Sequence, residues 1–192
     1  MKKLLITGFD PFGGAKVNPS WQAVSRLPDR VGEFELCKLE IPTVYDFATR
    51  VVLEKAAQFQ PDVILCVGQA GGRDSVTPER IGVNIRDARI TDNAGNQPRG
   101  EFVAPEGPAA YFATVPVEKM VQAIERAGIR ATVSNSAGAF VCNDTLYGIL
   151  HHYAGTNVRC GFVHVPYIPE QGSPSMPLEQ ITAALAAAIK VL

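Results

Sequence analysis

The chain has 192 residues, a formal net charge of -1 and 46% hydrophobic residues, which predicts one α/β domain over residues 1–192. No basic run stands out, so nucleic acid is not an expected partner. No apolar run reaches the roughly 20 residues that span a bilayer. The apolar start of the chain ends at Asp10 and Pro11, too early for a signal peptide. We therefore expect a cytoplasmic protein that binds no membrane.

The four cysteines lie far apart in the sequence. Cys37, Cys66 and Cys160 fall in apolar runs of strand length, where a reduced core residue is expected. The chain has no Cys-x-x-Cys motif, so the cysteines predict neither a zinc site nor a redox centre. Cys142 differs from the other three because it follows a loop of small residues that contains Gly138.

The first part of the chain alternates strands and helices. Strands are expected over residues 3–7, 34–41 and 63–67, and helices over 21–27 and 44–59. Ser20 is a suitable N-cap for the first helix, and Pro61 ends the second. The continuous apolar run 63–67 is typical of a parallel strand buried on both faces. This order predicts a three-layer α/β/α fold with a mostly parallel central sheet.

The second part is less regular. Strands are expected over residues 80–85, 131–134 and 160–165, and helices over 117–127, 145–150 and 178–191. Residues 86–116 lack a clear periodicity, with some strand expected only near 88–90. Ordered segments of this length usually serve a site or a subunit contact.

Candidate functional residues follow the ends of the predicted strands. In open parallel sheets, ligands bind outside the carboxyl ends of the strands. Phe9 and Phe12 follow the first strand, Gln69 follows strand 63–67, and His164 lies near the end of strand 160–165. The loop that contains Phe140 follows strand 131–134. We expect these segments to meet at one edge of the sheet.

Cys142 is the candidate nucleophile. It lies where the small-residue loop enters a helix, and the N-terminus of a helix favours a thiolate. The alternative is a buried structural cysteine. His151 and His152 lie about 14 Å further along the same helix, too far to share a proton with the thiol. By elimination His164 is the candidate base, and the alternative is a histidine of the core.

The group that orients His164 is left open by the sequence. A carboxylate near the same edge is required, and the candidates by position are Asp74, Glu79, Asp87 and Asp92. Glu79, at the entrance of a strand, is attractive because it would be fixed and partly buried. The backbone N–H of Cys142 and the side chain of Arg89 are candidates for stabilising an oxyanion.

Three phenylalanines, Phe9, Phe12 and Phe140, lie in the loops of this edge. They either anchor the loops or form a small apolar slot. Gln69 and the nearby glycines bring free backbone amides to the same place. Aromatic walls with a few amide partners suit a lactam ring, whose N–H and C=O both need partners when buried.

With these residues assembled, the chain resembles the pyroglutamyl peptidase I family of cysteine peptidases. The segments that carry the resemblance are TGFDPFG (7–13), NPS (18–20), GQAGGR (68–73), PER (78–80), DARITDNAGNQP (87–98), SAGAFVCN (136–143) and GFVHVP (161–166). The resemblance implies a phosphorylase/hydrolase-like α/β/α fold. It also implies removal of an N-terminal pyroglutamyl residue from peptides, without a metal or cofactor, by a cytoplasmic homotetramer.

The resemblance also implies residue roles. The catalytic triad falls on Glu79, Cys142 and His164, and oxyanion support falls on Arg89. The substrate pocket falls on Phe9, Phe12, Thr43, Gln69, Ile90, Phe140 and Val141, with Gln69 pairing the lactam through its backbone.

Three other functions compete with this one. An amidase or glutaminase-like enzyme would use a similar sheet, and a silent binding protein would keep only the pocket. A nucleoside phosphorylase would need a phosphate site, but no basic glycine-rich phosphate loop is evident.

Overall fold

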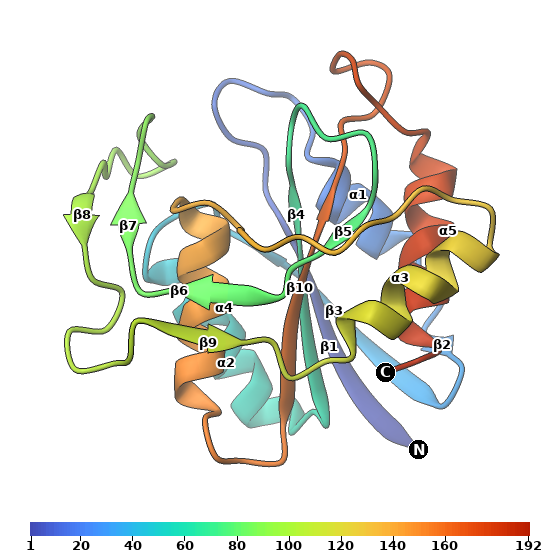
Figure 1. The fold of residues 1–192 in the computed structure, drawn as a ribbon, viewed down its shortest axis with the longest axis horizontal. Coiled ribbons are helices and arrows are strands. Elements are labelled where there is room, and N and C mark those ends of the chain that lie inside the picture. The colour runs from blue at the N-terminus through green and yellow to red at the C-terminus, as the bar shows by residue number, and fades with distance from the viewer.

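The structure is a computed structural model that describes residues 1–192 (Figure 1). Its central sheet has six strands in the order β2-β3-β1-β4-β10-β5. The strands are β1 (Lys2–Phe9), β2 (Arg30–Val31), β3 (Phe34–Ile41), β4 (Val63–Gln69), β5 (Thr77–Pro78) and β10 (Arg159–Val165). β3, β1, β4 and β10 are parallel, whereas the two-residue strands β2 and β5 close the edges in antiparallel pairing. The predicted mostly parallel sheet is confirmed.

Helices cover both faces of this sheet (Figure 1). On one face lie α1 (Pro19–Ser25), α3 (Val117–Arg126) and α5 (Leu178–Ile189), and on the other lie α2 (Phe47–Phe59) and α4 (Val141–His152). Each face has its own hydrophobic core, because successive side chains of a strand point to opposite faces. In β1, for example, Leu4 and Ile6 enter the core with α5, while Leu5 and Phe9 enter the core with α4. The three-layer α/β/α prediction is therefore confirmed. None of the helices is long and apolar enough to cross a lipid bilayer.

The irregular segment after β5 forms two small antiparallel ribbons beside α4 (Figure 1). β6 (Ile81–Val83) pairs with β9 (Ala110–Phe112), and β7 (Arg86–Asp87) pairs with β8 (Arg99–Glu101). The strand predicted near 88–90 lies just before these residues, at Arg86–Asp87, and the strand predicted over 80–85 is shorter than expected. Arg89 and Ile90 form an exposed bend, because the pairing with β8 ends at Asp87.

The segment 131–134 is not the buried strand that its apolar residues predict. It makes only two single-residue bridges, Ala131 with Val76 and Ser134 with Glu79, and it is partly exposed. The reason is that the edge strand β5 offers two residues, one of which is a proline without an N–H donor.

Three helix starts also differ from prediction. α4 begins at Val141 instead of 145, so Cys142 lies inside its first turn. α1 begins at Pro19, and its N-cap is Asn18, whose side chain accepts from the Ser20 N–H. α2 begins at Phe47 instead of 44, because Asp46 has a positive φ of 59° that interrupts the helical backbone.

All four cysteines are free thiols. Cys66 and Cys160 are buried as expected, but Cys37 is only half-buried, on the face of β3 toward α2.

Candidate active site

A cavity of about 360 Å³ lies at the carboxyl ends of β1, β4 and β10. The structure brings together in its lining nine of the residues selected from the sequence, namely Phe9, Phe12, Thr43, Gln69, Arg89, Ile90, Phe140, Cys142 and His164. These residues come from six separate segments of the chain, because parallel strands present their carboxyl ends at one edge of the sheet.

Cys142 is the second residue of α4 and reaches back to the sheet. A Cβ atom placed on Gly68 of β4 would lie 2.9 Å from the Cys142 sulfur, so the thiol rests on the bare backbone of that glycine. Gly68 is the register partner of His164 on the neighbouring strand β10. The sulfur and the imidazole therefore lie on the same face of the sheet, and both residues line one cavity.

His164 is buried and hydrogen-bonded on one side of its ring. Its Nδ1 lies 2.7 Å from Oε1 of Glu79, and its ring packs on Phe162 at 4.8 Å between centroids. An ionised carboxylate can only accept, so Nδ1 donates and Nε2 is left as the proton acceptor. The imidazole is thus held in the tautomer that a base requires.

Glu79 is completely buried. Burial acts to raise the pKa of its carboxyl, but the hydrogen bond and charge of His164 and the hydrogen bond of Arg73 oppose burial, and that pKa lies below its ordinary value. Arg73 donates to the same oxygen, Oε1, at 2.7 Å. The carboxylate is consequently ionised at neutral pH although no water reaches it.

The other three candidate acids lie elsewhere. Asp74 pairs with Arg130 at the surface, 3.5 Å apart. Asp92 is buried and accepts the Tyr45 N–H at 3.0 Å, so it orders a loop. Asp87 lines the cavity, but the carboxylate that accepts from His164 is that of Glu79. Of the four candidate carboxylates, Glu79 is therefore the one hydrogen-bonded to His164.

The thiol and the imidazole have shifted pKa values. Burial raises the pKa of Cys142 to about 12, and the Glu79 carboxylate acts in the same direction. Burial also lowers the pKa of His164, although Glu79 opposes that effect. Burial therefore has a larger effect on the thiol pKa than the helix N-terminus has, and the expectation of a lowered thiol pKa is wrong. At neutral pH both groups are uncharged, and the thiol needs a base in order to react.

Aromatic rings form the apolar end of the cavity. Phe12 and Phe140 lie 5.9 Å apart between ring centroids, and Tyr45 meets Phe140 edge-on at 5.5 Å. Phe9 is almost fully buried and packs on Phe162. Val141 was expected in this lining and is not part of it. Its side chain is completely buried in the core between α4 and the sheet.

Asp10 organises this end of the cavity, and sequence reasoning missed it. Its Oδ1 accepts from the Thr43 N–H at 2.7 Å and from the Asn93 side chain at 3.2 Å. Its backbone oxygen accepts from the Asn18 side chain. An aspartate between Phe9 and Pro11 in a turn was the available signal, because such side chains bond neighbouring backbone.

Arg89 and Gln69 complete the lining. Arg89 is exposed, and its guanidinium makes no hydrogen bond or ion pair within the chain. Its positive charge therefore lies at the cavity without a partner in the chain. The side-chain oxygen of Gln69 accepts from Gln171 at 2.8 Å.

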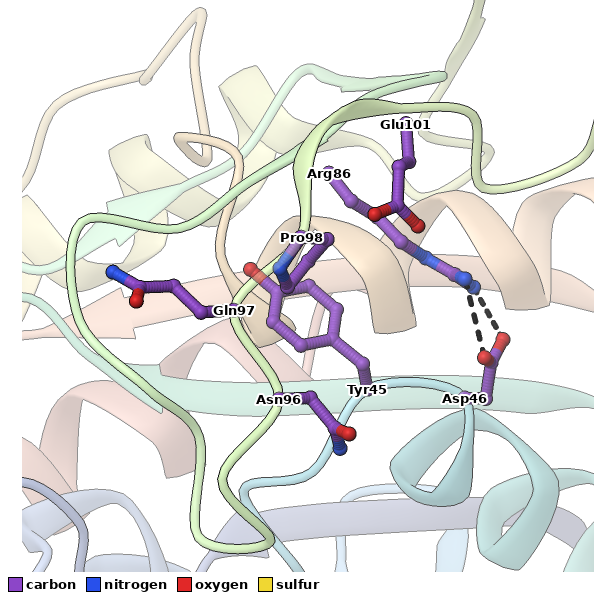
Figure 2. Close-up of a pocket in the computed structure, with 7 residues that line it drawn as sticks. All are labelled: Tyr45, Asp46, Arg86, Asn96, Gln97, Pro98 and Glu101. Carbon is purple, nitrogen blue, oxygen red and sulfur yellow. Dashed lines mark hydrogen bonds and ion pairs between the residues drawn. The ribbon is translucent and has the colours of Figure 1, made fainter.

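A second cavity, of about 320 Å³, lies beside the start of α2 and under the β7–β8 ribbon (Figure 2). In Figure 2 the Arg86 guanidinium points at Asp46, with which it forms two hydrogen bonds. Its Nε donates to the buried Asp144 at 2.6 Å. Asp144 lies two residues after Cys142, so this network fixes the first turn of α4 to α2 and β7.

A three-layer α/β/α fold whose cavity is lined by a cysteine at a helix N-terminus and by a carboxylate-bonded histidine has the groups that cysteine hydrolases use. Comparison with known proteins is more specific, because the profile of the pyroglutamyl peptidase family matches residues 2–192. The chain belongs to the pyroglutamyl peptidase family and is a cysteine peptidase.

Individual relatives are similar to this protein over the whole length of its chain. A pyrrolidone-carboxylate peptidase of Staphylococcus saprophyticus is 48% identical over 197 residues, covering 99% of this chain and 92% of its own. The crystal structure of Bacillus amyloliquefaciens pyroglutamyl peptidase I is 47% identical, with a TM-score of 0.96 over 100% of this chain and 96% of its own. Pyrrolidone carboxyl peptidase from Thermococcus litoralis has a TM-score of 0.95 at 37% identity, over 100% and 93% of the two chains.

Proposed function

We propose that this protein removes the N-terminal pyroglutamyl residue from peptides, with Cys142 as nucleophile, His164 as base and Glu79 as the group that orients His164. The names of the relatives support this activity. The observation that carries the assignment is the contact of the Cys142 sulfur with Gly68, the register partner of His164, because it brings thiol and imidazole to one cavity wall.

Acylation begins with transfer of the thiol proton to Nε2 of His164 as the sulfur attacks the pyroglutamyl carbonyl carbon. The negative oxygen that forms accepts from the backbone N–H of Cys142, which has no partner within the first turn of α4. The free guanidinium of Arg89 supplies a positive charge at the same cavity. The ionised Glu79 stabilises the imidazolium that His164 becomes.

Collapse of this intermediate breaks the amide bond. His164 returns the proton to the leaving amine, and the pyroglutamyl group remains on sulfur as a thioester. His164 then takes a proton from water, whose oxygen attacks the thioester. The product is free pyroglutamate, and the thiolate recovers the proton.

Specificity follows from the lining. A lactam ring is flat and uncharged, so it packs against the paired rings of Phe12 and Phe140 without leaving a buried charge. Its N–H and C=O pair with backbone groups beside Gln69, and Thr43 and Ile90 close the slot. An ordinary N-terminal amino group is charged and would be buried against apolar rings, since the Asp10 carboxylate at this end already accepts from Thr43 and Asn93.

The same family membership supports a wider proposal. We propose one catalytic domain over residues 1–192, because α1 near the start of the chain packs against α5 at its end. A homotetramer in the cytoplasm remains a proposal from family resemblance alone.

Release of a chromophore from a pyroglutamyl arylamide tests the activity, with prolyl and glutamyl arylamides as controls. We expect turnover of the pyroglutamyl compound alone, and loss of it in Cys142→Ser. A glutaminase-like enzyme would instead hydrolyse glutamine or a γ-amide. A silent binding protein would retain the lactam in a binding assay but release no chromophore, and treatment with iodoacetamide would abolish no activity.

A further inference from the structure

Arg73 is the cationic side chain closest to the buried Glu79, and the proposed mechanism does not use it. It lies in the loop after β4, and its side chain is 29% exposed. Its Nη1 donates to Glu79 Oε1 at 2.7 Å and also to the Thr77 hydroxyl. Its Nη2 donates to the Ser136 backbone oxygen at 3.0 Å. One guanidinium thus joins the loop after β4, strand β5, Glu79 and the loop that precedes Cys142.

Only one of the two carboxylate oxygens of Glu79 accepts hydrogen bonds. Oε1 accepts from both Arg73 and His164, whereas Oε2 is buried without a partner. A fully buried carboxylate with one unpartnered oxygen is costly to keep ionised. The donors on Oε1 therefore decide its charge state, and Arg73 is the permanently charged one of the two.

We infer that Arg73 is the positioning residue of this site: it keeps Glu79 ionised and oriented toward His164, and it holds the Ser136 carbonyl in the loop that leads to Cys142. This inference rests on the proposed function. Arginine suits both tasks because its planar fork sends two donors in fixed directions, which a lysine ammonium cannot do at these two acceptors.

The charge of Arg73 also acts on the neighbouring titrations. It lowers the pKa of His164 and that of Cys142, and its hydrogen bond lowers the pKa of Glu79. The titratable or charged groups that face this cavity are Arg73, Asp87, Arg89, Cys142 and His164, with Glu79 behind His164. Removal of the Arg73 charge is consequently expected to raise the pH at which the hydrogen-bonded Glu79–His164 pair takes up a proton, which the resonances of the His164 ring report.

The test compares Arg73→Gln, which removes the positive charge, with Arg73→Lys, which keeps the charge but loses the planar guanidinium with its two donor nitrogens. Arg80→Gln is a matched control, because Arg80 follows Glu79 in sequence yet pairs outward with Glu118 and Asn135. The readouts are the pH profile of kcat/KM on a pyroglutamyl arylamide and the NMR titration of the His164 ring, which needs no activity.

In Arg73→Gln we expect the acidic limb of the profile and the His164 titration to move up by roughly 1 pH unit. In Arg73→Lys we expect the limb to stay in place while kcat falls about 10-fold or more, since the loop loses a fixed contact. Arg80→Gln is expected to match the wild type in both.

An unshifted His164 titration in a folded Arg73→Gln protein would overturn the inference. Should Arg73→Gln fail to fold, wild-type kcat in Arg73→Lys would overturn it. The proposed function fails separately, if the wild-type protein releases no chromophore at any pH, and the NMR titration still tests the inference in that case.

Discussion

The sulfur of Cys142 lies on Gly68, so closely that a methyl group on that glycine would be 2.9 Å from the sulfur and 2.8 Å from the Phe162 ring. Real Cβ atoms do not approach other atoms so closely, because repulsion rises steeply below van der Waals contact. The position of the thiol therefore depends on the absence of a side chain on the strand beneath it.

We predict that Gly68→Ala displaces the thiol and lowers kcat about 100-fold, since small misplacements of a nucleophile are costly. Gly161→Ala is the control, because Gly161 lies on the adjacent strand β10 and its added methyl would meet Val115, at 2.3 Å, away from the thiol. Both variants should lose thermal stability, but only Gly68→Ala should lose kcat per folded molecule. Equal kcat in the two variants would contradict the prediction.

Phe140 is expected to contribute to substrate binding through its apolar surface. We predict that Phe140→Ala raises KM for a pyroglutamyl arylamide about 10-fold, or about 1.4 kcal/mol, with a smaller change in kcat. Phe112→Ala is a suitable control, because Phe112 is 67% exposed on β9 and does not line the cavity. Steady-state kinetics measure KM and kcat of the two variants and of the wild type. A KM increase of similar size in both would show that the effect is not local.

The Glu79–His164 pair predicts how stability depends on pH. The pKa of His164 is lowered from its ordinary value of 6.5, and that of Glu79 is lowered from 4.5. In both cases the unfolded chain binds protons more readily than the folded one. The stabilisation is therefore complete above pH 6.5 and is lost as pH falls, first through the folded pKa of His164 and then through that of Glu79.

Urea unfolding at a series of pH values measures this dependence. We expect the free energy of unfolding to decline below pH 6.5 in the wild type and to stay level down to about pH 4.5 in His164→Gln. The exposed His152 provides the control, and His152→Gln is expected to keep the wild-type decline. If the free energy of unfolding of His164→Gln declined as in the wild type, the decline would come from groups other than His164.

The Asp144–Arg86 pair is expected to stabilise the start of α4. Asp144 is fully buried and Arg86 nearly so, with 2.6 Å between them. Removal of Asp144 leaves the nearly buried Arg86 with only the exposed Asp46 as an ion-pair partner, so Asp144→Ala should lower the free energy of unfolding by about 3 kcal/mol or more. Asp46 contacts the same arginine, but its side chain is 75% exposed, and Asp46→Asn should cost less than about 1 kcal/mol. Equal losses in the two variants, measured by urea unfolding, would contradict this.

Much of the architecture is determined by the sequence itself. Continuous apolar runs such as 63–67 specify strands buried on both faces, and the alternation of strands with helices specifies a parallel sheet. That topology alone predicts that Phe9, Gln69 and His164 meet at one edge, because parallel strands all end there. The family motifs around Cys142 could be read directly from the chain.

Only the tertiary structure decided which groups touch. Glu79 and His164 are 85 positions apart in the chain and meet at 2.7 Å, and no periodicity distinguishes Glu79 from Asp87 as the partner. Val141 points into the core and not into the cavity, and segment 131–134 forms no strand, because the neighbouring edge offers two residues for pairing. Local sequence patterns indicate the secondary structure of each segment and which of its faces is buried. The contacts of a buried charge depend on segments distant in sequence, and these meet only in the folded chain.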